Sequence, residues 1–127
     1  MNEFRPLTPR EREIVSHLLS AERPGVAELR RQSEVLLARP WTCGCASIDL
    51  AVDETRARPS PIEGRPAIEA QSKDREDPTR IFDLLLWVDD GWLSAIQLVE
   101  YGLDRHEDAN VFPSPDDFHP PGAASVV

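Results

Sequence analysis

The chain is poor in features that mark several large classes of protein. Among its 127 residues are two cysteines and six glycines, and no apolar run approaches the length of a membrane span. Two cysteines alone do not make a disulfide scaffold. The first residues, MNEFRPLTPRERE, lack the apolar core of a secretion signal. We therefore expect a cytoplasmic protein that does not enter the membrane.

Motifs of the common catalytic sites are also missing. The sequence has no G-x-S-x-G, no P-loop and no G-x-G-x-x-G. Its three histidines, His17, His106 and His119, have no ligand-like spacing. Carboxylates are many, yet they form no organised pair. A solvated acidic face is the simpler interpretation of them, so we expect no enzyme, no metal site and no cofactor.

Negative charge is present in excess and is unevenly distributed. The formal net charge is −9. Residues 1–40 hold seven Lys or Arg against six Asp or Glu, whereas residues 41–127 hold seven against seventeen. Nucleic acids and anionic membranes need clustered positive charge, so the balance argues against both as partners. It suits a basic protein partner, or simply solubility.

The strongest local pattern is RIFDLLLWVDDGWLSAIQLVEY, residues 80–101. An Asp-Gly pair between apolar runs predicts a two-stranded hairpin turning at Asp90-Gly91. Before the turn, alternate apolar residues define one face of the strand. After it the alternation fails, because Leu93 and Ile96 differ by an odd number of positions. One extra residue restores it, so we predict a β-bulge near Ser94-Ala95. The bulge would put Leu93, Ile96 and Leu98 on the face of Leu84, Leu86 and Val88.

The opposite face of this hairpin mixes aromatic and acidic side chains. Asp83, Leu85, Trp87 and Asp89 alternate along it, and Trp92 lies at its end. Either a C-terminal segment covers the tryptophans or a partner does, since Trp is enriched at interface hot spots. The candidate protein-binding residues are Asp83, Trp87, Asp89 and Trp92, with Asp49 and Cys43 beside them.

The remaining elements predict an α+β fold, ordered α-α-β-β-β-β. Thr8, Pro9 and Glu11 form the start signals of a helix that ends near Glu22, and a second helix runs from about Val26 to Ala38. Strands follow at Ala46–Asp53 and, weakly, at Ala67–Lys73. We expect the two helices to pack on one face of a three- to four-stranded, mainly antiparallel sheet.

The chain divides by composition into a domain and a tail. Residues 1–103 form a single α+β domain, and residues 104–127 form an acidic, proline-rich tail. Phe112 and Phe118 are its candidate anchors, and the residues after Pro120 are expected to be mobile.

Cys43-Gly44-Cys45 has several interpretations. If the strand extends back through it, the two cysteines point to the same side with Cβ atoms about 7 Å apart, too far for an unstrained disulfide. Small residues that fill a crowded part of the sheet are then the simplest explanation. A thiol-dependent metal or redox site is the alternative, although redox pairs are usually C-x-x-C.

The run CGCASIDLAVD, followed by LLLWVDDGWLSAIQLVEYG and FPSPDD, resembles a family of small uncharacterised acidic bacterial proteins. In that family a CGC-x-S-I-D-L strand precedes a D-G-x-L hairpin and a Pro-Asp tail. The RPLT start and the segment Gly25 to Gln32 are also similar to it. Gln97 stands where the family's hairpin usually has an acid. The resemblance implies a fold only. Bulged hairpins of this kind also occur in small immunity proteins, which is an analogy.

These features together favour a non-enzymatic protein-binding module, such as an immunity-type inhibitor of a toxin or effector. A thiol-dependent metal or redox protein using Cys43 and Cys45 is a second hypothesis. A structural homodimer subunit is a third.

Overall fold

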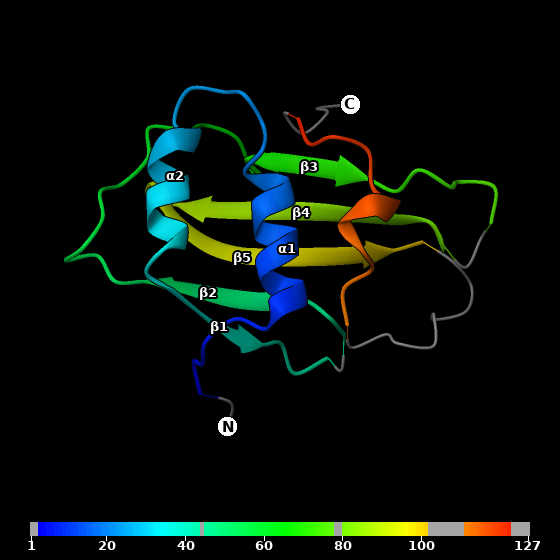
Figure 1. Cartoon of the computed structure of the whole chain (residues 1–127), viewed down its shortest axis with the longest axis horizontal. Coiled ribbons are helices and arrows are strands. Elements are labelled where there is room, and N and C mark those ends of the chain that lie inside the picture. Colours follow the sequence, from blue (N-terminus) through cyan, green and yellow to red (C-terminus); the bar gives the residue numbers. More distant parts are fainter. Residues whose placement is uncertain (1–2, 44, 78–79, 102–110, 123–127) are drawn as a thin grey trace.

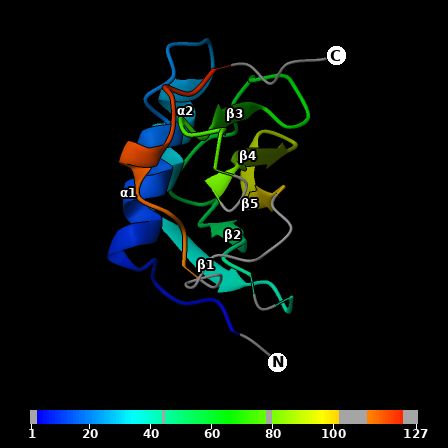
Figure 2. The ribbon, with the colours of Figure 1, turned by 90° about the vertical axis from the view of Figure 1, so that its right-hand side faces the viewer.

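A computed structural model describes residues 3–43, 45–77, 80–101 and 111–122. In this part of the chain two helices, α1 (Pro9–Leu18) and α2 (Val26–Ser33), precede a five-stranded antiparallel sheet. The strands are β1 (Leu36–Pro40), β2 (Ile48–Val52), β3 (Ile68–Gln71), β4 (Phe82–Asp89) and β5 (Trp92–Glu100), in the spatial order β1-β2-β5-β4-β3. Figure 1 shows this order, and Figure 2 shows both helices on the same side of the sheet. The α+β class and the antiparallel sheet are confirmed, whereas the predicted count of three to four strands was wrong.

Helix α1 begins as its sequence predicts. The Thr8 hydroxyl accepts from the Glu11 N–H, and the Glu11 carboxylate accepts from the Thr8 N–H, which is a capping box. Arg5 also donates two hydrogen bonds to that carboxylate, at 2.7 and 3.0 Å. The helix ends at Leu18, four residues before the predicted end near Glu22. Its buried stripe of Ile14, Val15 and Leu18 joins the main core.

The predicted second helix was too long. It ends at Ser33, and residues 36–38, which were assigned to its last turn, belong to strand β1 (Leu36–Pro40) instead. The run VLLARP is apolar enough for either structure, and antiparallel pairing with β2 decides between them, from Leu36 opposite Val52 to Pro40 opposite Ile48. Leu36 and Ala38 are buried while Leu37 is exposed, which is the alternation of a strand.

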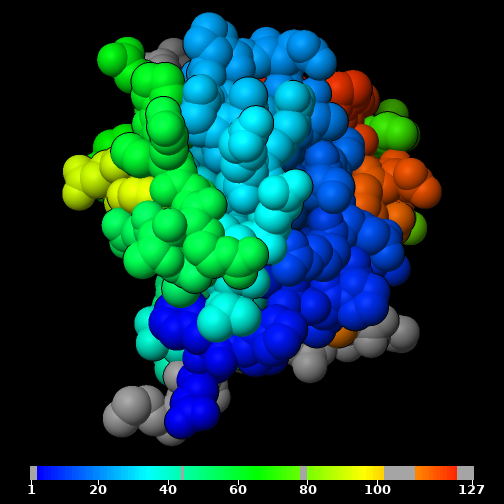
Figure 3. Space-filling model, turned by 60° about the vertical axis from the view of Figure 1, so that its left-hand side comes forward, coloured from blue at the N-terminus to red at the C-terminus, as the bar shows by residue number. Residues whose placement is uncertain are grey.

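The other two strands before the central hairpin match their predicted positions within two residues at each end. Strand β2 spans Ile48–Val52 and β3 spans Ile68–Gln71. Between them, residues 54–66 run beside α2, as the green atoms next to the cyan helix in Figure 3 show. The Ser60 hydroxyl fastens this segment by donating to the Gly25 carbonyl at 2.7 Å.

The central hairpin and its bulge are confirmed. Asp90 and Gly91 turn the chain with φ values of 51° and 87°. The register shifts between Trp87 and Val88, because Trp87 lies opposite Ala95 while Val88 lies opposite Leu93. Ser94 is thus the extra residue on β5. As predicted, the shift returns the apolar residues of β5 to the buried face, where Leu86 is opposite Ile96 and Leu84 is opposite Leu98.

A buried glutamine joins α2 to the turn of this hairpin. Gln32 has no exposed surface. Its amide nitrogen donates to the carbonyls of Arg58 (2.8 Å) and Gly91 (2.7 Å), and its amide oxygen accepts from the Leu93 N–H (2.9 Å). The Gly91 carbonyl also accepts from the Ser60 N–H. One side chain therefore holds together the helix, residues 58–60 and the hairpin turn.

The C-terminal segment, where described, packs on the helix side and along one edge of the sheet. Phe112 and Phe118 are buried, so both predicted anchors are confirmed. Phe118 pairs with Ser72, and Gly122 pairs with Glu69 of β3. The predicted boundary at 103/104, the acidic residues Asp104, Glu107 and Asp108, and the end of the chain after residue 122 lie outside the described residues. Among the described helices, none is long and apolar enough to cross a membrane.

We expect Gln32→Leu to lower the free energy of unfolding by about 2–4 kcal/mol. The change leaves the buried N–H of Leu93 without its acceptor and removes a donor from two carbonyls, and an unsatisfied buried group costs about 1–3 kcal/mol. Urea denaturation measures the difference. Gln71→Leu is the matched control on an exposed position of β3 and should stay within about 0.5 kcal/mol of the parent. Equal effects of the two changes would contradict the role of Gln32.

Candidate functional site

The face of the sheet that is turned away from the helices carries the sequence-predicted site, and we call it the open face. Residues directly opposite one another in antiparallel strands share a face. The register therefore places Asp49, Ala95 and Trp87 in one row across β2, β5 and β4. The larger side chains of the open face are Leu37, Arg39, Asp49, Glu69, Gln71, Asp83, Leu85, Trp87, Asp89, Trp92, Gln97 and Val99.

Five of the six predicted site residues belong to this face. Asp49, Asp83, Trp87 and Asp89 follow the alternation of β2 and β4, and Trp92 lies opposite Asp89 beyond the bulge. The sixth, Cys43, lies in the connection between β1 and β2 instead. The prediction that these strand residues share one face is therefore correct, because alternation along a strand can be read from the local sequence.

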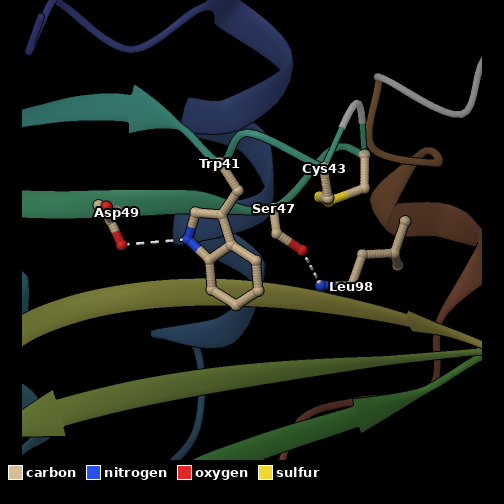
Figure 4. The surroundings of a disulfide bond; sticks show 6 residues. Trp41, Cys43, Ser47, Asp49 and Leu98 are labelled. Carbon is tan, nitrogen blue, oxygen red and sulfur yellow. Dashed lines mark hydrogen bonds between the residues drawn. A yellow bond between two sulfur atoms is a disulfide. The ribbon is translucent and has the colours of Figure 1, made fainter. Parts of the chain in front are cut away.

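Two half-buried tryptophans, Trp87 on the open face and Trp41 beside Asp49, each have the ring nitrogen anchored by a hydrogen bond. The Trp87 indole N–H donates to the Gln97 side-chain oxygen at 3.1 Å. Trp41, which sequence reasoning did not include, donates its indole N–H to an Asp49 carboxylate oxygen at 3.1 Å, as Figure 4 shows. Its position just after Pro40, at the end of β1, is the signal that would have placed it here. Anchored rings keep one orientation and present apolar surface to solvent.

Nothing in the described part of the tail covers these rings. Residues 111–122 bond to the helix side, where Arg10 donates to the Phe112 carbonyl and a His17 ring nitrogen lies 3.0 Å from the His119 carbonyl oxygen. Figure 2 shows this segment, in orange and red, beside α1 and away from the far side of the sheet. Residues 102–110 lie outside the described residues. Within the described ranges, no part of the tail therefore covers the open face, whose tryptophans are partly accessible to solvent.

Each of the three predicted acids has a basic or hydroxyl partner. Arg39 bonds Asp49 at 3.0 Å and also lies over the ring of Phe4, 4.4 Å from its centroid. Asp89 accepts from the Ser94 hydroxyl at 2.7 Å and pairs with Arg65 at 3.4 Å. Asp83 is only 7% exposed, since Tyr101 and Arg75 close over it at 2.8 and 3.3 Å. Asp83 therefore orders the face more than it offers charge to a partner.

A hollow of about 450 Å³ opens where the turn of the central hairpin meets the end of β2. Its apolar wall includes Leu50, Val52 and Trp92, and its rim includes Glu54, Asp89 and Asp90. An aromatic wall under an acidic rim suits a long basic side chain, whose stem packs on the indole while its charge meets the carboxylates.

A second hollow has the opposite charge. It measures about 590 Å³ and lies between α2 and residues 55–58, with Arg31, Arg56 and Arg58 in its lining and Glu28 among them. Arg56 also acts on Asp53, whose pKa is lowered mainly by hydrogen bonds from Thr55 and in smaller part by this guanidinium. Positive charge in the described residues is thus partly gathered on the helix side.

Cys43 and Cys45 form a disulfide, which corrects the prediction that they lie too far apart. That prediction placed both on one extended strand. Because residues 36–40 are a strand and not a helix end, residues 41–47 form the tip of a β1–β2 hairpin. The Trp41 N–H donates to the Ser47 carbonyl at 3.0 Å, one step beyond the pair Pro40 and Ile48. The same register brings Cys43 opposite Cys45, with Cα atoms 5.3 Å apart.

This disulfide contributes little to the stability of the fold. In the chain-entropy account a bond that closes 15 residues stabilises by about 3 kcal/mol, and the effect falls with the logarithm of loop length. A three-residue loop gives roughly 1.5 kcal/mol on the same relation. The hairpin is also held by the five residue pairs of β1 and β2 and by Ser47, whose buried hydroxyl accepts from the Leu98 N–H at 2.9 Å.

Within the described residues, no group of three or more His, Cys, Asp or Glu side chains is placed to hold a metal ion. Comparison with protein-family models, with curated proteins and with solved structures finds no match for this chain. The resemblance of its CGC and D-G-x-L segments to a bacterial family stays a prediction.

The single tyrosine reports on the buried acid of the open face. The pKa of Tyr101 is raised, first because its hydroxyl donates to Asp83 and then because burial and nearby negative charge disfavour the phenolate. We expect its spectrophotometric titration to have a midpoint above the usual value of about 10 and to fall back toward it in Asp83→Asn. Asp89→Asn is the control that should leave the midpoint unchanged. An unshifted midpoint in the parent would contradict the contact.

Proposed function

We propose that this chain is a non-enzymatic protein-binding module whose open face docks on a basic patch of another protein. The proposal rests on one observation: a partly accessible sheet face presents half-buried indoles that are anchored beside acidic side chains. An inhibitor that covers the active surface of a toxin or effector, as immunity proteins do, is the form of this function that we favour.

The indoles supply the main binding energy in this account. Trp41 and Trp87 already satisfy their polar N–H groups within the chain, so a partner needs only to cover their rings. Ordering them at an interface costs little side-chain entropy, because the hydrogen bonds hold them in place beforehand. Tryptophan is the residue type most typical of hot spots near the centre of an interface.

Both edges of the sheet are occupied, which directs a partner to the face. The backbone of Arg5 exchanges two hydrogen bonds with Ala38 of β1, each 2.8 Å long. Along β3, Gly122 exchanges two hydrogen bonds with Glu69, and the His119 N–H donates to Gln71. A partner peptide that extends the sheet needs free edge groups. The covered edges therefore support docking through side chains on the open face.

Charge favours a basic partner. The segment from residue 41 onward carries ten more acidic than basic residues. The hollow beside Trp92 adds an apolar wall and an acidic rim that fit a Lys or Arg side chain. Long-range attraction of this kind mainly speeds association and weakens as salt screens it. The same proposal places the module in the cytoplasm and gives it no nucleic acid, membrane, metal or cofactor partner.

Affinity purification from the native cell tests the docking face. We expect the wild-type protein to retain a basic partner. The affinity of the Trp87→Ala variant for this partner should be lower by about thirtyfold or more, since a hot-spot indole contributes about 2 kcal/mol or more. Added salt should weaken the wild-type complex. Arg31→Ala, exposed on α2, is the matched control and should bind as wild type does. Melting curves of each variant confirm that it is folded.

Equal retention of the partner by the Trp87→Ala variant would contradict the assignment of the face. Sedimentation of the purified protein addresses the homodimer hypothesis. A stable dimer that Trp87→Ala dissociates would show that the open face binds a second copy of the chain, and would also overturn docking on a basic partner.

A further inference from the structure

The tip of the β1–β2 hairpin combines a closed disulfide with access from solvent. Figure 4 shows the Cys43–Cys45 bond next to Trp41 and Ser47. Cys43 is exposed and Cys45 is half-buried. A thiolate in solution therefore reaches the Cys43 sulfur more readily, and Cys45 is the leaving group.

The hairpin below the bond is held by contacts that do not involve the disulfide. The bond closes a loop of three residues, and the hairpin below it stays paired through Pro40 and Ile48 and through the Trp41–Ser47 hydrogen bond. Neither cysteine belongs to the hydrophobic core. A structural staple usually joins distant segments and resists reduction, whereas an exposed bond in a small loop is the kind that exchanges.

We propose that Cys43 and Cys45 form a thiol–disulfide exchange site that responds to low-molecular-weight thiols. A thiolate of the pool attacks the Cys43 sulfur, the bond between the cysteines breaks, and Cys45 leaves as a thiolate that takes up a proton. A second thiolate then attacks the mixed disulfide at its non-protein sulfur, releasing Cys43 as a thiolate that is protonated in turn. Two electrons pass from two thiols to the protein, and the thiols leave as one disulfide.

The reverse sequence closes the ring again. The Cys43 thiolate attacks a low-molecular-weight disulfide and expels one thiolate. Cys45 then attacks the Cys43 sulfur and expels the other. The two cysteines lie opposite each other across the hairpin, with Cα atoms 5.3 Å apart, so this second step has a short distance to cover. The exchange chemistry does not depend on the proposed function, although the site adjoins Trp41.

Equilibration of the whole protein with glutathione tests the site. The native protein is held in buffers that span a series of reduced to oxidised glutathione ratios, then acid-quenched, alkylated and weighed by mass spectrometry. We expect the count of free thiols to rise from none to two across the series, with no denaturant present. A protein that stays fully disulfide-bonded at every ratio, or reacts only when unfolded, would overturn the proposal.

Two single variants test the order of attack, and circular dichroism tests independence from the fold. Cys45→Ser keeps the exposed thiol and should form a mixed disulfide with oxidised glutathione several-fold faster than Cys43→Ser, its matched control. The reduced protein and the double serine variant should keep the wild-type spectrum and melt no more than about 6 °C below it. Loss of the folded spectrum on reduction, or a faster Cys43→Ser reaction, would contradict the assignment.

Discussion

The buried amide of Gln32 is the interaction on which the arrangement of this molecule depends. It is the one side chain among the described residues that bonds helix α2, the segment at Arg58 and the central hairpin at Gly91 and Leu93 at once. Such a group is costly to bury unless every polar atom has a partner, and here each of them does. All hydrogen bonds of the amide therefore form only in one position of helix α2 relative to the hairpin. That position decides which face of β4 and β5 is covered and which stays open.

The hairpin turn next to this amide allows little choice of residue at position 91. Gly91 has a φ of 87°, and a Cβ atom built on it would lie 2.7 Å from the Ser60 carbonyl oxygen. Both the backbone conformation and the close approach of residues 59–60 require glycine at this position. The bulge at Ser94 then corrects the alternation of β5, so that aliphatic side chains face the helices and the indoles face away. Fold and candidate site are thus two consequences of one hairpin.

The hairpin could be predicted because its signals are local. The Asp-Gly turn, the alternation of β4 and the parity mismatch on β5 all lie within 22 residues, and the structure confirms each of them. Strand β1 could not be predicted in this way, because VLLARP fits a helix or a strand and only its pairing with β2 decides. The error at β1 caused the error at Cys43 and Cys45, since a strand on both sides turns residues 41–47 into a hairpin tip.

Contacts made across the sequence account for the rest of what was missed. The partners of Gln32 lie 26 to 61 residues further along the chain, and no local pattern marks them. The acids of the open face looked solvated from the sequence, yet arginines from other segments pair with Asp49, Asp83 and Asp89. The open face therefore carries less net negative charge than the sequence of its strands suggests. Its aromatic surface is then the more important feature for recognition by a partner.

Quenching of tryptophan emission by acrylamide tests most directly that the indoles face solvent. Acrylamide is neutral, so its access to a ring depends on exposure rather than on the charge of the surface. We expect acrylamide to quench all three partly exposed tryptophans in the native protein, each resolved by replacing the other two with phenylalanine. Emission from Trp41 and Trp87 that is shielded as in a protein core, and quenched only after unfolding, would contradict it.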